Sequence, residues 1–316
     1  MEIIKDYDVI IVGGGPAGLT AGLYCKRAVL DTVLFEKGLI GGQIAISKDV
    51  DNYPGVEGIT GFDLAEKLLH HAQSFGLNII QQEVAEVIAG PDHHSVRLAS
   101  GDMLSSHALI LAAGGSVRKL GIPGEAEYAG SGVSYCATCD GFFFRNKTTV
   151  VVGGGDTAVE EALYLSRLAK KVYLVHRKKE LRASKLLQNR LLSEPAIEVI
   201  TNNIITEIRG DGHVVTAVAL ENTETSEKRE LPTDGVFIFI GYLPNNQLIP
   251  PGVRMNEQGY VITDDSCETS VPGIFAIGDL RQKFANQIVV AAADGCIAAL
   301  AAARYIERQK AEGASS

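Results

Sequence analysis

Two cysteines separated by two residues, Cys136 and Cys139 in the stretch SYCATCDG, have the clearest chemical potential in this sequence. Thiols at this spacing can bind a metal, form a structural disulfide or exchange electrons with another disulfide. A zinc site normally takes four ligands, and the other cysteines, at 25, 267 and 296, are isolated. A structural disulfide of this span removes little chain entropy and suits a reducing compartment poorly. We therefore interpret the pair as a redox centre.

The neighbouring residues favour thiol–disulfide exchange. A helix starting here would favour the thiolate form of one cysteine, and exchange would pass through a mixed disulfide that the second cysteine resolves. Asp140 places a carboxyl beside Cys139, where we expect it to transfer protons; a turn-forming role before Gly141 is the structural alternative. The three remaining cysteines are expected to be small buried or half-buried hydrophobic side chains.

A glycine-rich turn near the N-terminus has the pattern of a dinucleotide site. Gly13-x-Gly15-x-x-Gly18 follows a β-branched run and precedes a helical segment, so its backbone can approach a pyrophosphate at the helix N-terminus. Glu36 ends the next expected strand, where a carboxylate accepts hydrogen bonds from a ribose diol. The alternative is a tight turn without a ligand. We favour a site for an adenosine diphosphate group without an extra phosphate.

The same pattern recurs at a constant offset of 140 residues, as Gly153-x-Gly155-x-x-Ala158. The position equivalent to Glu36 is here His176, followed by Arg177, Lys178 and, after a short interval, Arg182. An acid would repel a 2′-phosphate, whereas this basic group would bind it, so the second turn is typical of an NADP site. A solvated basic helix start is the alternative. FAD at the first turn and NADPH at the second is the simplest pairing.

These turns must be positioned by strands and helices, and the repeat predicts two βαβ units. The expected fold is α/β, with two Rossmann-like, three-layer ββα nucleotide-binding domains, one inserted in the other. Gly and Pro interrupt the periodicity at 116–127 and 241–252, which gives a discontinuous domain, 1–117 with 247–316, and an inserted domain, 118–246. Outside the repeat we expect helices at 61–75, 179–192 and 286–308, short strands within 77–111, 198–231, 235–240 and 273–279, and a disordered end at 311–316.

Composition narrows the class of protein. The 316 residues are 46% hydrophobic with a net charge of −9, which disfavours nucleic acid and anionic membranes as partners. Uninterrupted apolar runs are shorter than the roughly 20 residues of a membrane span, and no signal peptide is visible, so a cytoplasmic location is expected. No metal is predicted, because the histidine pairs 70–71 and 93–94 lack ligand spacing.

Several motifs together resemble one known family, the low-molecular-weight, bacterial-type thioredoxin reductases. They are GGGPAG, GGQ at 41–43, DNYPG at 51–55, CATCDGFFFRN at 136–146, GGGDTAVEEALYL, HRKKELRAS and GIFAIGD. The similarity extends from about Tyr7 to Arg308. It implies an FAD domain made from both ends of the chain, an inserted NADPH domain that also holds the cysteine pair, a homodimer, and thioredoxin as the protein substrate.

The resemblance also implies roles for single residues. Cys136 would attack the disulfide of thioredoxin, Cys139 would face the flavin, and Asp140 would donate and accept protons. The FAD contacts would be Gly13, Gly15, Pro16, Ala17, Glu36, Lys37, Gln43, Asn52, Val84, Ala112, Gly114, Asp279, Gln287 and Ile288. The NADPH contacts would be Gly155, Asp156, Thr157, His176, Arg177, Lys178 and Arg182.

Three positions depart from the family pattern. Lys178 replaces the second arginine of an HRR motif, which keeps the charge but loses bidentate phosphate binding. Asn286-Gln287-Ile288 stands where Arg-Gln-Ala is usual, and Ala113 where threonine is usual. None of these changes removes a catalytic group.

In the expected reaction a hydride passes from NADPH to the flavin, two electrons pass to the cysteine pair, and the dithiol reduces thioredoxin. Both the pair and the NADP turn lie in the inserted domain, so we expect this domain to rotate, with hinges near Val117-Arg118 and Leu243-Pro244. The alternatives are a related reductase using NADH or ferredoxin, one with another thioredoxin-like acceptor, and a non-catalytic redox sensor.

Overall fold

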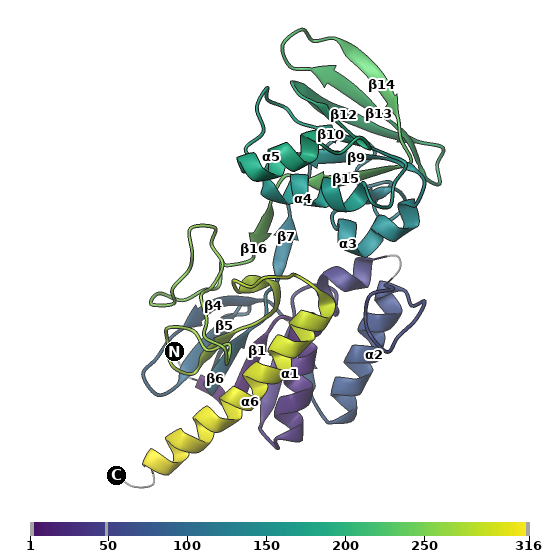
Figure 1. Ribbon diagram of the computed structural model, residues 1–316. Helices are drawn as coiled ribbons and strands as arrows, with labels where there is room; N and C mark the ends of the chain where they lie inside the picture. The colour runs from purple at the N-terminus through teal and green to yellow at the C-terminus, as the bar shows by residue number, and fades with distance from the viewer. Residues whose placement is uncertain (1–2, 48–49, 314–316) are drawn as a thin grey trace. The chain divides into compact units, whose positions relative to one another are not determined.

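A computed structural model describes residues 3–47 and 50–313, which form two compact units. The first unit combines Met1–Ser116 with Leu243–Ser316, and the second is Val117–Tyr242 (Figure 1). The domain borders expected from the sequence, 117/118 and 246/247, lie one and four residues from these.

The first unit is built on a mainly parallel sheet. Its strands follow the order β3-β2-β1-β6-β5-β4, and β17 pairs with the second half of β6. The strands β1, β2, β3, β6 and β17 run parallel, whereas β4, β5 and β6 form antiparallel pairs. Their bounds are Ile3–Val12 for β1, Thr32–Phe35 for β2, Asn78–Ile80 for β3, Val84–Ile88 for β4, His94–Leu98 for β5, Met103–Leu111 for β6 and Ile274–Ala276 for β17.

Both faces of this sheet are covered, which explains the continuous hydrophobic run at the end of β1. Val9 and Ile11 pack with helices α1 (Pro16–Arg27) and α6 (Ile288–Gly313), while Ile10 and Val12 pack with residues of β4 and β5. Helix α2 (Gly61–Ser74) lies against α1, close to the expected 61–75. Helices, parallel sheet and antiparallel strands thus make three layers, as predicted.

Helix α6 is the one described helix long and apolar enough to cross a membrane by length and composition, over Ile288–Glu312. The mean hydropathy of its most apolar window is 1.6, and 39% of that window is buried. The buried side packs along α1, with Ala298, Ala299 and Ala302 inside the core, so packing accounts for its apolar character. The expected disorder from 311 is wrong for 311–313, which continue the helix; 314–316 lie outside the described residues.

The second unit repeats the three layers. A parallel sheet of order β11-β10-β9-β15-β8 carries helices α4 and α5 on one face and the antiparallel sheet β12-β13-β14 on the other. The helices are α4 (Asp156–Leu165) and α5 (Lys185–Leu192). The strands are β8 (Val133–Ser134), β9 (Thr148–Gly153), β10 (Lys171–Val175), β11 (Ile197–Ile200), β12 (Asn203–Gly210), β13 (Val215–Asn222), β14 (Lys228–Pro232) and β15 (Gly235–Phe239).

Helix α5 begins six residues later than the sequence predicted. The backbone N–H groups of Arg182 and Ala183 donate to the carbonyl of Gly154, which ties this segment to the glycine turn. Ser184 then caps α5, its hydroxyl accepting from the N–H of Leu187. Residues 179–184 are therefore a loop beside the second turn, because the amides of Arg182, Ala183 and Ser184 are already bonded outside the helix.

The two segments that link the units lie side by side. Strand β7 (Gly115–Val117) pairs with β16 (Tyr242–Pro244) in a two-stranded sheet. Asn245 adds side-chain bonds, accepting from the Ser116 hydroxyl at 2.8 Å and donating to the Ala113 carbonyl at 2.8 Å. The remaining helical segments are α3 (Ala137–Asp140), η1 (Gly42–Ile46), η2 (Gly141–Phe144) and η3 (Gly278–Leu280).

Candidate active site

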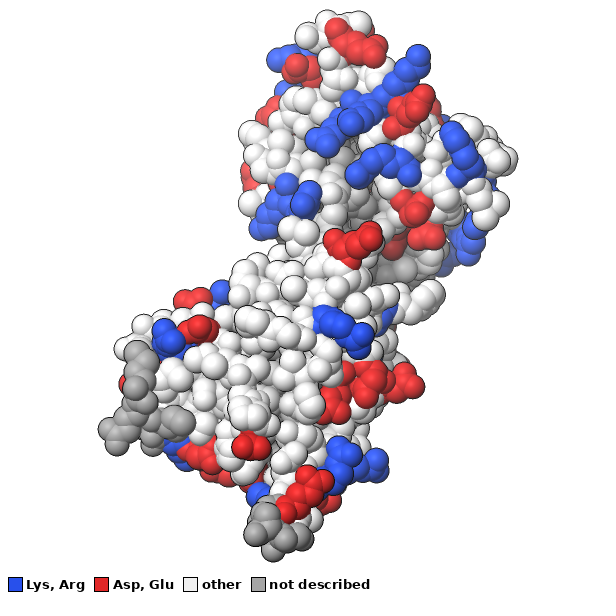
Figure 2. Space-filling view, turned by 90° about the vertical axis from the view of Figure 1, so that its left-hand side faces the viewer, with Lys and Arg blue, Asp and Glu red and all other residues white. Residues whose placement is uncertain are grey.

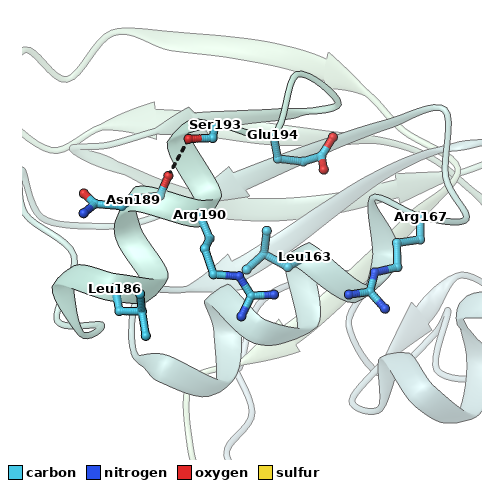
Figure 3. A pocket seen from close by; sticks show the side chains of 7 residues that line it. All are labelled: Leu163, Arg167, Leu186, Asn189, Arg190, Ser193 and Glu194. Carbon is cyan, nitrogen blue, oxygen red and sulfur yellow. Dashed lines mark hydrogen bonds between the residues drawn. The ribbon is translucent and has the colours of Figure 1, made fainter.

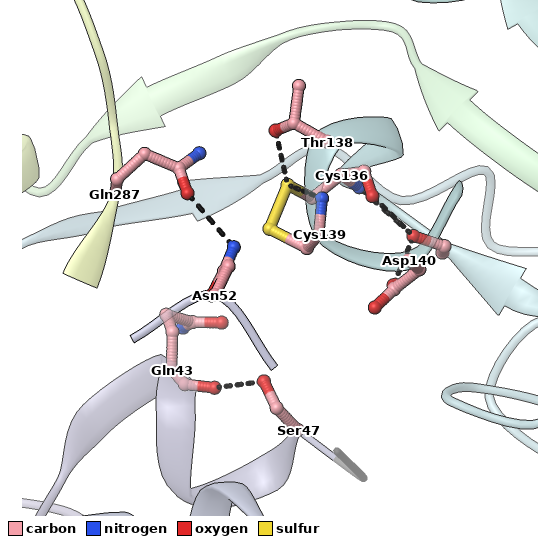
Figure 4. The surroundings of a disulfide bond; sticks show 9 residues. Gln43, Ser47, Asn52, Cys136, Thr138, Cys139, Asp140 and Gln287 are labelled. Carbon is pink, nitrogen blue, oxygen red and sulfur yellow. Dashed lines mark hydrogen bonds between the residues drawn. A yellow bond between two sulfur atoms is a disulfide. The ribbon is translucent and has the colours of Figure 1, made fainter. Parts of the chain in front are cut away.

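Cys136 and Cys139 form a disulfide in the second unit, with 5.3 Å between their Cα atoms (Figure 4). Cys136 occupies the N-cap of the one-turn helix α3, and its Sγ accepts a hydrogen bond from the backbone N–H of Cys139 at 3.2 Å. Thr138 Oγ1 lies 3.4 Å from the same sulfur. A donor aimed at Cys136 Sγ stabilises negative charge on that atom once the disulfide opens. Cys136 is thus the cysteine whose surroundings suit a thiolate.

Asp140, the last residue of α3, is held by a buried serine. The hydroxyl of Ser134, at the end of β8, lies 2.5 Å from Asp140 Oδ2 and accepts from the backbone N–H of Cys136 at 3.1 Å. The same hydroxyl lies 3.2 Å from the Cys136 carbonyl, but its single proton can be donated to one acceptor at a time. Ser134 therefore joins the carboxylate directly to the redox loop.

A second buried group fixes the segment that precedes the cysteines. Glu125, which is buried, accepts from the Tyr135 hydroxyl at 2.9 Å and from the backbone N–H groups of Leu120 and Gly121 at 2.9 and 2.6 Å. Burial, followed by the hydrogen bond with Glu125, raises the pKa of Tyr135. The tyrosine therefore remains a neutral hydrogen-bond donor at neutral pH. Because Tyr135 directly precedes Cys136, its bond to Glu125 also restrains the backbone at Cys136.

Apolar rings are exposed next to the disulfide. The side chain of Phe142 is 63% exposed and that of Phe143 is 42% exposed, whereas Phe144 is buried against Phe237. The Arg145 guanidinium lies 5.5 Å from the ring centre of Phe142. Large apolar side chains exposed beside a reactive group are typical of a surface that meets another protein.

The first glycine turn follows β1 and requires glycine at two positions. Gly13 has a φ of +114°, and a Cβ there would lie 2.3 Å from the carbonyl oxygen of Ala112. A Cβ at Gly18 would lie 1.9 Å from the carbonyl oxygen of Gly13. At Gly15 the nearest atom to an added Cβ is 4.0 Å away, so the space over this residue is open to a ligand.

Glu36 lies over this turn, as its place at the end of β2 predicts. One carboxylate oxygen accepts from the backbone N–H of Gly14 at 2.6 Å, and the other accepts from the N–H of Gly38 at 2.7 Å. The carboxyl ends of β1, β2, β6 and β17 meet at one edge of the parallel sheet. The residues that follow these strands therefore gather at the edge where dinucleotides bind in such folds.

The other residues expected at FAD lie in the same unit. Asn52 donates to the Gln287 side chain at 3.2 Å, so these two, far apart in sequence, are brought together. Asp279 in η3 forms an ion pair with Lys283 at 3.2 Å. Pro16 and Ala17 open α1, Ile288 opens α6, and Gln43 lies in η1; Val84 and Ala112 are buried, Gly114 has a φ of +66°, and Lys37 pairs with Glu83.

Lys283 belongs to a buried charged network that the local sequence pattern does not predict. Its ammonium also lies 3.4 Å from Asp294 of α6, and Asp294 accepts from Arg281 at 2.8 Å and from the Gly278 N–H at 3.1 Å. This network fixes the loop that carries Asp279. In the sequence its members look like ordinary surface charges, because only the fold brings α6 under η3.

The second glycine turn is closed by a histidine. A Cβ at Gly154 would lie 2.3 Å from Nδ1 of His176, so the ring packs directly on the turn. His176 is 6% exposed, and burial lowers its pKa, which makes the neutral imidazole the form present at neutral pH. Its Nε2 has no hydrogen-bond partner among the described residues. His176 was expected to be part of a basic cluster. In the structure its imidazole is buried and neutral, so it can donate or accept a hydrogen bond but adds no charge to the cluster.

The cationic side chains of that cluster are exposed. Arg177, Lys178 and Arg182 follow β10 and the glycine turn, and none of the three forms an ion pair with another residue in 3–47 or 50–313. Asp156 and Thr157 begin α4 beside them, Gly155 has open space above it, and Asp156 Oδ1 accepts from the N–H of Ser184 at 2.7 Å. Figure 2 shows several Lys and Arg side chains on one face of this unit, at the top, with Asp and Glu side chains between them.

A surface pocket of about 410 Å³ lies elsewhere in the second unit, between α4 and α5 (Figure 3). Its lining consists of Leu163, Arg167, Leu186, Asn189, Arg190, Ser193 and Glu194. None of these residues was expected at a nucleotide, and the pocket is separate from the glycine turn.

Comparisons with known proteins agree with this geometry. Residues 7–295 match the family described as pyridine nucleotide-disulphide oxidoreductase. The thioredoxin reductase of Bacillus subtilis (strain 168) is 47% identical over 303 residues, covering 96% of each chain. The chain belongs to the thioredoxin reductase family.

Two solved thioredoxin reductases are also similar to this chain. That of Streptococcus pyogenes MGAS5005 is 41% identical with a TM-score of 0.93, and that of Lactococcus lactis, in its FR conformation, is 40% identical with a TM-score of 0.64. Each covers 96% of this chain, which covers 99% of each.

Membership of the thioredoxin reductase family confirms the resemblance seen in the motifs and the predicted α/β fold. Within it, the structure brings Cys136, Cys139 and Asp140 into one loop, and places the two glycine turns at equivalent sheet edges. No role was predicted from the sequence for Ser134, Tyr135 or Glu125. Ser134 and Tyr135 lie within SYCATCDG, where a polar side chain two residues before a redox cysteine could have indicated a positioning role.

Proposed function

We propose that this chain is a thioredoxin reductase that takes electrons from NADPH through FAD and delivers them to thioredoxin. The Cys136–Cys139 disulfide, formed at a helix start in a member of this family, is the observation that carries the proposal. When bound, the flavin would accept a hydride from NADPH and supply two electrons to the disulfide. The residues of the chain bind, orient and exchange protons around that transfer.

The two turns fit the two proposed cofactors differently. At the first turn, the open space above Gly15 suits a pyrophosphate, and the Glu36 carboxylate suits ribose hydroxyls. At the second, the unpartnered Nε2 of His176 is a buried polar atom that a bound nucleotide would satisfy. The exposed charges of Arg177, Lys178 and Arg182 suit a 2′-phosphate. FAD is therefore assigned to the first unit and NADPH to the second.

The thiols then act in a fixed order. Two electrons and two protons convert the Cys136–Cys139 disulfide to a dithiol. The Cys136 thiolate attacks one sulfur of thioredoxin's disulfide, forming a mixed disulfide and releasing the other thioredoxin sulfur as a thiolate. The Cys139 thiolate attacks Cys136 Sγ, which restores the original disulfide and frees reduced thioredoxin. Asp140, held by Ser134, exchanges the protons, because it is the carboxyl nearest to this loop in sequence.

The partner and the assembly follow from the same reading. The exposed rings of Phe142 and Phe143, next to the disulfide, suit contact with a protein substrate, here proposed to be thioredoxin. A homodimer is proposed from the family resemblance and from Val289, Ile297 and Leu300, which are exposed on α6. A cytoplasmic location is proposed, because a dithiol that cycles with a disulfide suits a compartment in which thiols are kept reduced.

Rotation of the second unit against the first would let both the disulfide and the nicotinamide reach one flavin. The two solved relatives are 41% and 40% identical to this chain, but their TM-scores against it are 0.93 and 0.64, so the two structures are not superimposable on each other. A change in orientation between rigid units produces such a difference. The paired linkers β7 and β16 are the proposed hinge.

The test is an anaerobic titration of the purified yellow protein with NADPH, followed by oxidised thioredoxin. We expect flavin absorbance to bleach with NADPH and to recover with thioredoxin. In Cys139→Ser the bleaching should persist and the recovery should be lost, because the disulfide no longer forms. Bleaching by NADH or reduced ferredoxin but not by NADPH would overturn the donor assignment, and recovery in Cys139→Ser would overturn the role of the pair.

A further inference from the structure

Three potential metal ligands lie together in the first unit, outside the proposed redox site. Asp6 is on β1, His107 is on β6, and His93 immediately precedes β5. Strand β6 lies between the other two, and the register pairs Asp6 with Ser105 and His94 with Ser106. Side chains two residues apart on a strand share a face, so Ser105 and His107 point the same way. The sheet register thus joins residues that have no ligand spacing in the sequence.

The donor atoms are close enough for one ion. One ligand atom from each of Asp6, His93 and His107 lies within 4.8 Å of the others. His93 Nε2 is 3.6 Å from Asp6 Oδ2, and the two imidazole rings have centroids 4.2 Å apart. Bonds of about 2.1 Å to a tetrahedral ion require donor atoms about 3.4 Å apart. His93 and Asp6 are both exposed, so neighbouring side chains do not enclose them and they have room to turn toward one ion.

The carboxylate is already oriented. The Ser105 hydroxyl donates to Asp6 Oδ1, which leaves Oδ2 directed toward His93. A hydroxyl that fixes a ligating carboxylate is the usual outer support of a metal site. The group also lies at the start of β1, six residues before the strand ends at the glycine turn, or roughly 20 Å at 3.3 Å per residue. It is therefore separate from the dinucleotide site.

We propose that Asp6, His93 and His107 bind a divalent transition-metal ion, with Zn²⁺ as the ion that suits them best. Two imidazoles and one carboxylate match the ligand preference of Zn²⁺, whereas Mg²⁺ and Ca²⁺ select oxygen ligands. Three protein ligands leave one tetrahedral position for water or for a donor from another molecule. This site goes beyond the proposed reductase function and does not depend on it.

Calorimetric titration of ZnCl₂ into the metal-stripped, oxidised, FAD-loaded protein tests the proposal. The disulfide form is used without thiol reductant, so that Cys136 and Cys139 offer no thiolate. We expect one ion per chain and at least about a tenfold rise in Kd for His107→Ala, and a rise of roughly tenfold for Ser105→Ala, the loss seen when the support of a ligand is removed. His71→Ala, an exposed histidine on α2, is the matched control and should bind as the parent does.

Binding that is equal in the parent, His107→Ala and His71→Ala would overturn the site, as would the absence of saturable binding. Thermal unfolding of each variant without metal checks that it folds. Because binding rather than turnover is measured, failure of this site leaves the reductase proposal unaffected, and an inactive reductase leaves the metal site testable.

Discussion

At the scale of single residues, the redox loop is organised by side chains that carry no redox chemistry. Ser134 contacts both Asp140 and the Cys136 backbone, while Glu125 holds Tyr135 and two amides of the preceding loop. Both groups are buried, so their hydrogen bonds are shielded from water and hold a defined geometry. In the proposed reaction, Ser134 is a positioning residue for Asp140.

Replacing Ser134 with alanine should reduce turnover with thioredoxin by roughly tenfold, the effect of losing one hydrogen bond to a charged group. The KM for thioredoxin should stay at the parent value, because Ser134 is buried and bonds to Asp140 within the redox loop. Steady-state kinetics measures kcat and KM separately. Ser134→Thr keeps the hydroxyl and should restore kcat. A Ser134→Ala enzyme with the parent kcat would exclude the positioning role.

The three cysteines outside the redox pair show why thiol chemistry is confined to one loop. Burial raises the pKa of Cys25 to about 12 and that of Cys267 to about 12, so both remain thiols at neutral pH. Cys296 is only half-buried. The expectation that these three are buried or half-buried hydrophobic side chains is confirmed.

At the scale of elements, the two glycine turns look equivalent in sequence but differ in packing. The third position is Gly18 in the first turn and Ala158 in the second. In the first turn there is no room for a Cβ next to the Gly13 carbonyl, whereas in the second the Ala158 methyl packs against Gly153. A side chain at the third position is therefore excluded in the first turn and accommodated in the second.

Gly18→Ala and Gly15→Ala should separate packing from ligand approach. Gly18→Ala should lower the midpoint of thermal unfolding of the FAD-free protein by roughly 2–12 °C, because overpacking costs about 1–3 kcal/mol. Gly15→Ala should leave that midpoint unchanged, since its Cβ meets open space, yet it should weaken FAD binding. Calorimetry of the FAD-free proteins and flavin absorbance after reconstitution give the two readouts. Equal midpoints for both variants would contradict this division.

Local patterns predicted the elements well where one short-range signal dominates. The glycine turns, their flanking strands and α2 lie where periodicity and turn residues indicated. The predicted start of α5 was wrong because the amides of Arg182 and Ala183 bond to the Gly154 carbonyl. Arg182 and Gly154 are 28 residues apart in the chain, so this bond has no signature in the local sequence. The network of Arg281, Lys283 and Asp294 was missed for the same reason: it exists only after α6 packs under η3. Contacts between residues far apart in the chain leave no pattern in the local sequence.

At the scale of the whole molecule, two chain crossings connect the units. They pair as β7 and β16, and Asn245 bonds to Ser116 and Ala113 across them. A hinge must bend along a defined path, and side-chain bonds that hold the two crossings together restrict that path. In the proposed reaction, Asn245 therefore guides the rotation.

Asn245→Ala should lower kcat by roughly tenfold and change KM with it, as hinge substitutions do, while FAD content stays at the parent level. Asn246→Ala is the matched control, because Asn246 donates to the Gly259 carbonyl and has no bond to the first crossing among the described residues. Steady-state kinetics and the flavin-to-protein absorbance ratio measure the outcome. A parent kcat in Asn245→Ala, or an equal loss in Asn246→Ala, would count against a guided hinge.

The close approach of α6 to α1 has a consequence for biosynthesis. Gly295 faces the backbone of Ala17 so tightly that a Cβ would lie 2.3 Å from its carbonyl oxygen, and α6 supplies a large part of the core on α1. The first unit therefore remains incomplete until α6 leaves the ribosome. The second unit is contiguous and emerges whole before that point. In the nascent chain, the second unit, which holds Cys136 and Cys139, can therefore fold before α6 has been synthesised. The strands of the first unit that precede it can be covered by α6 only later.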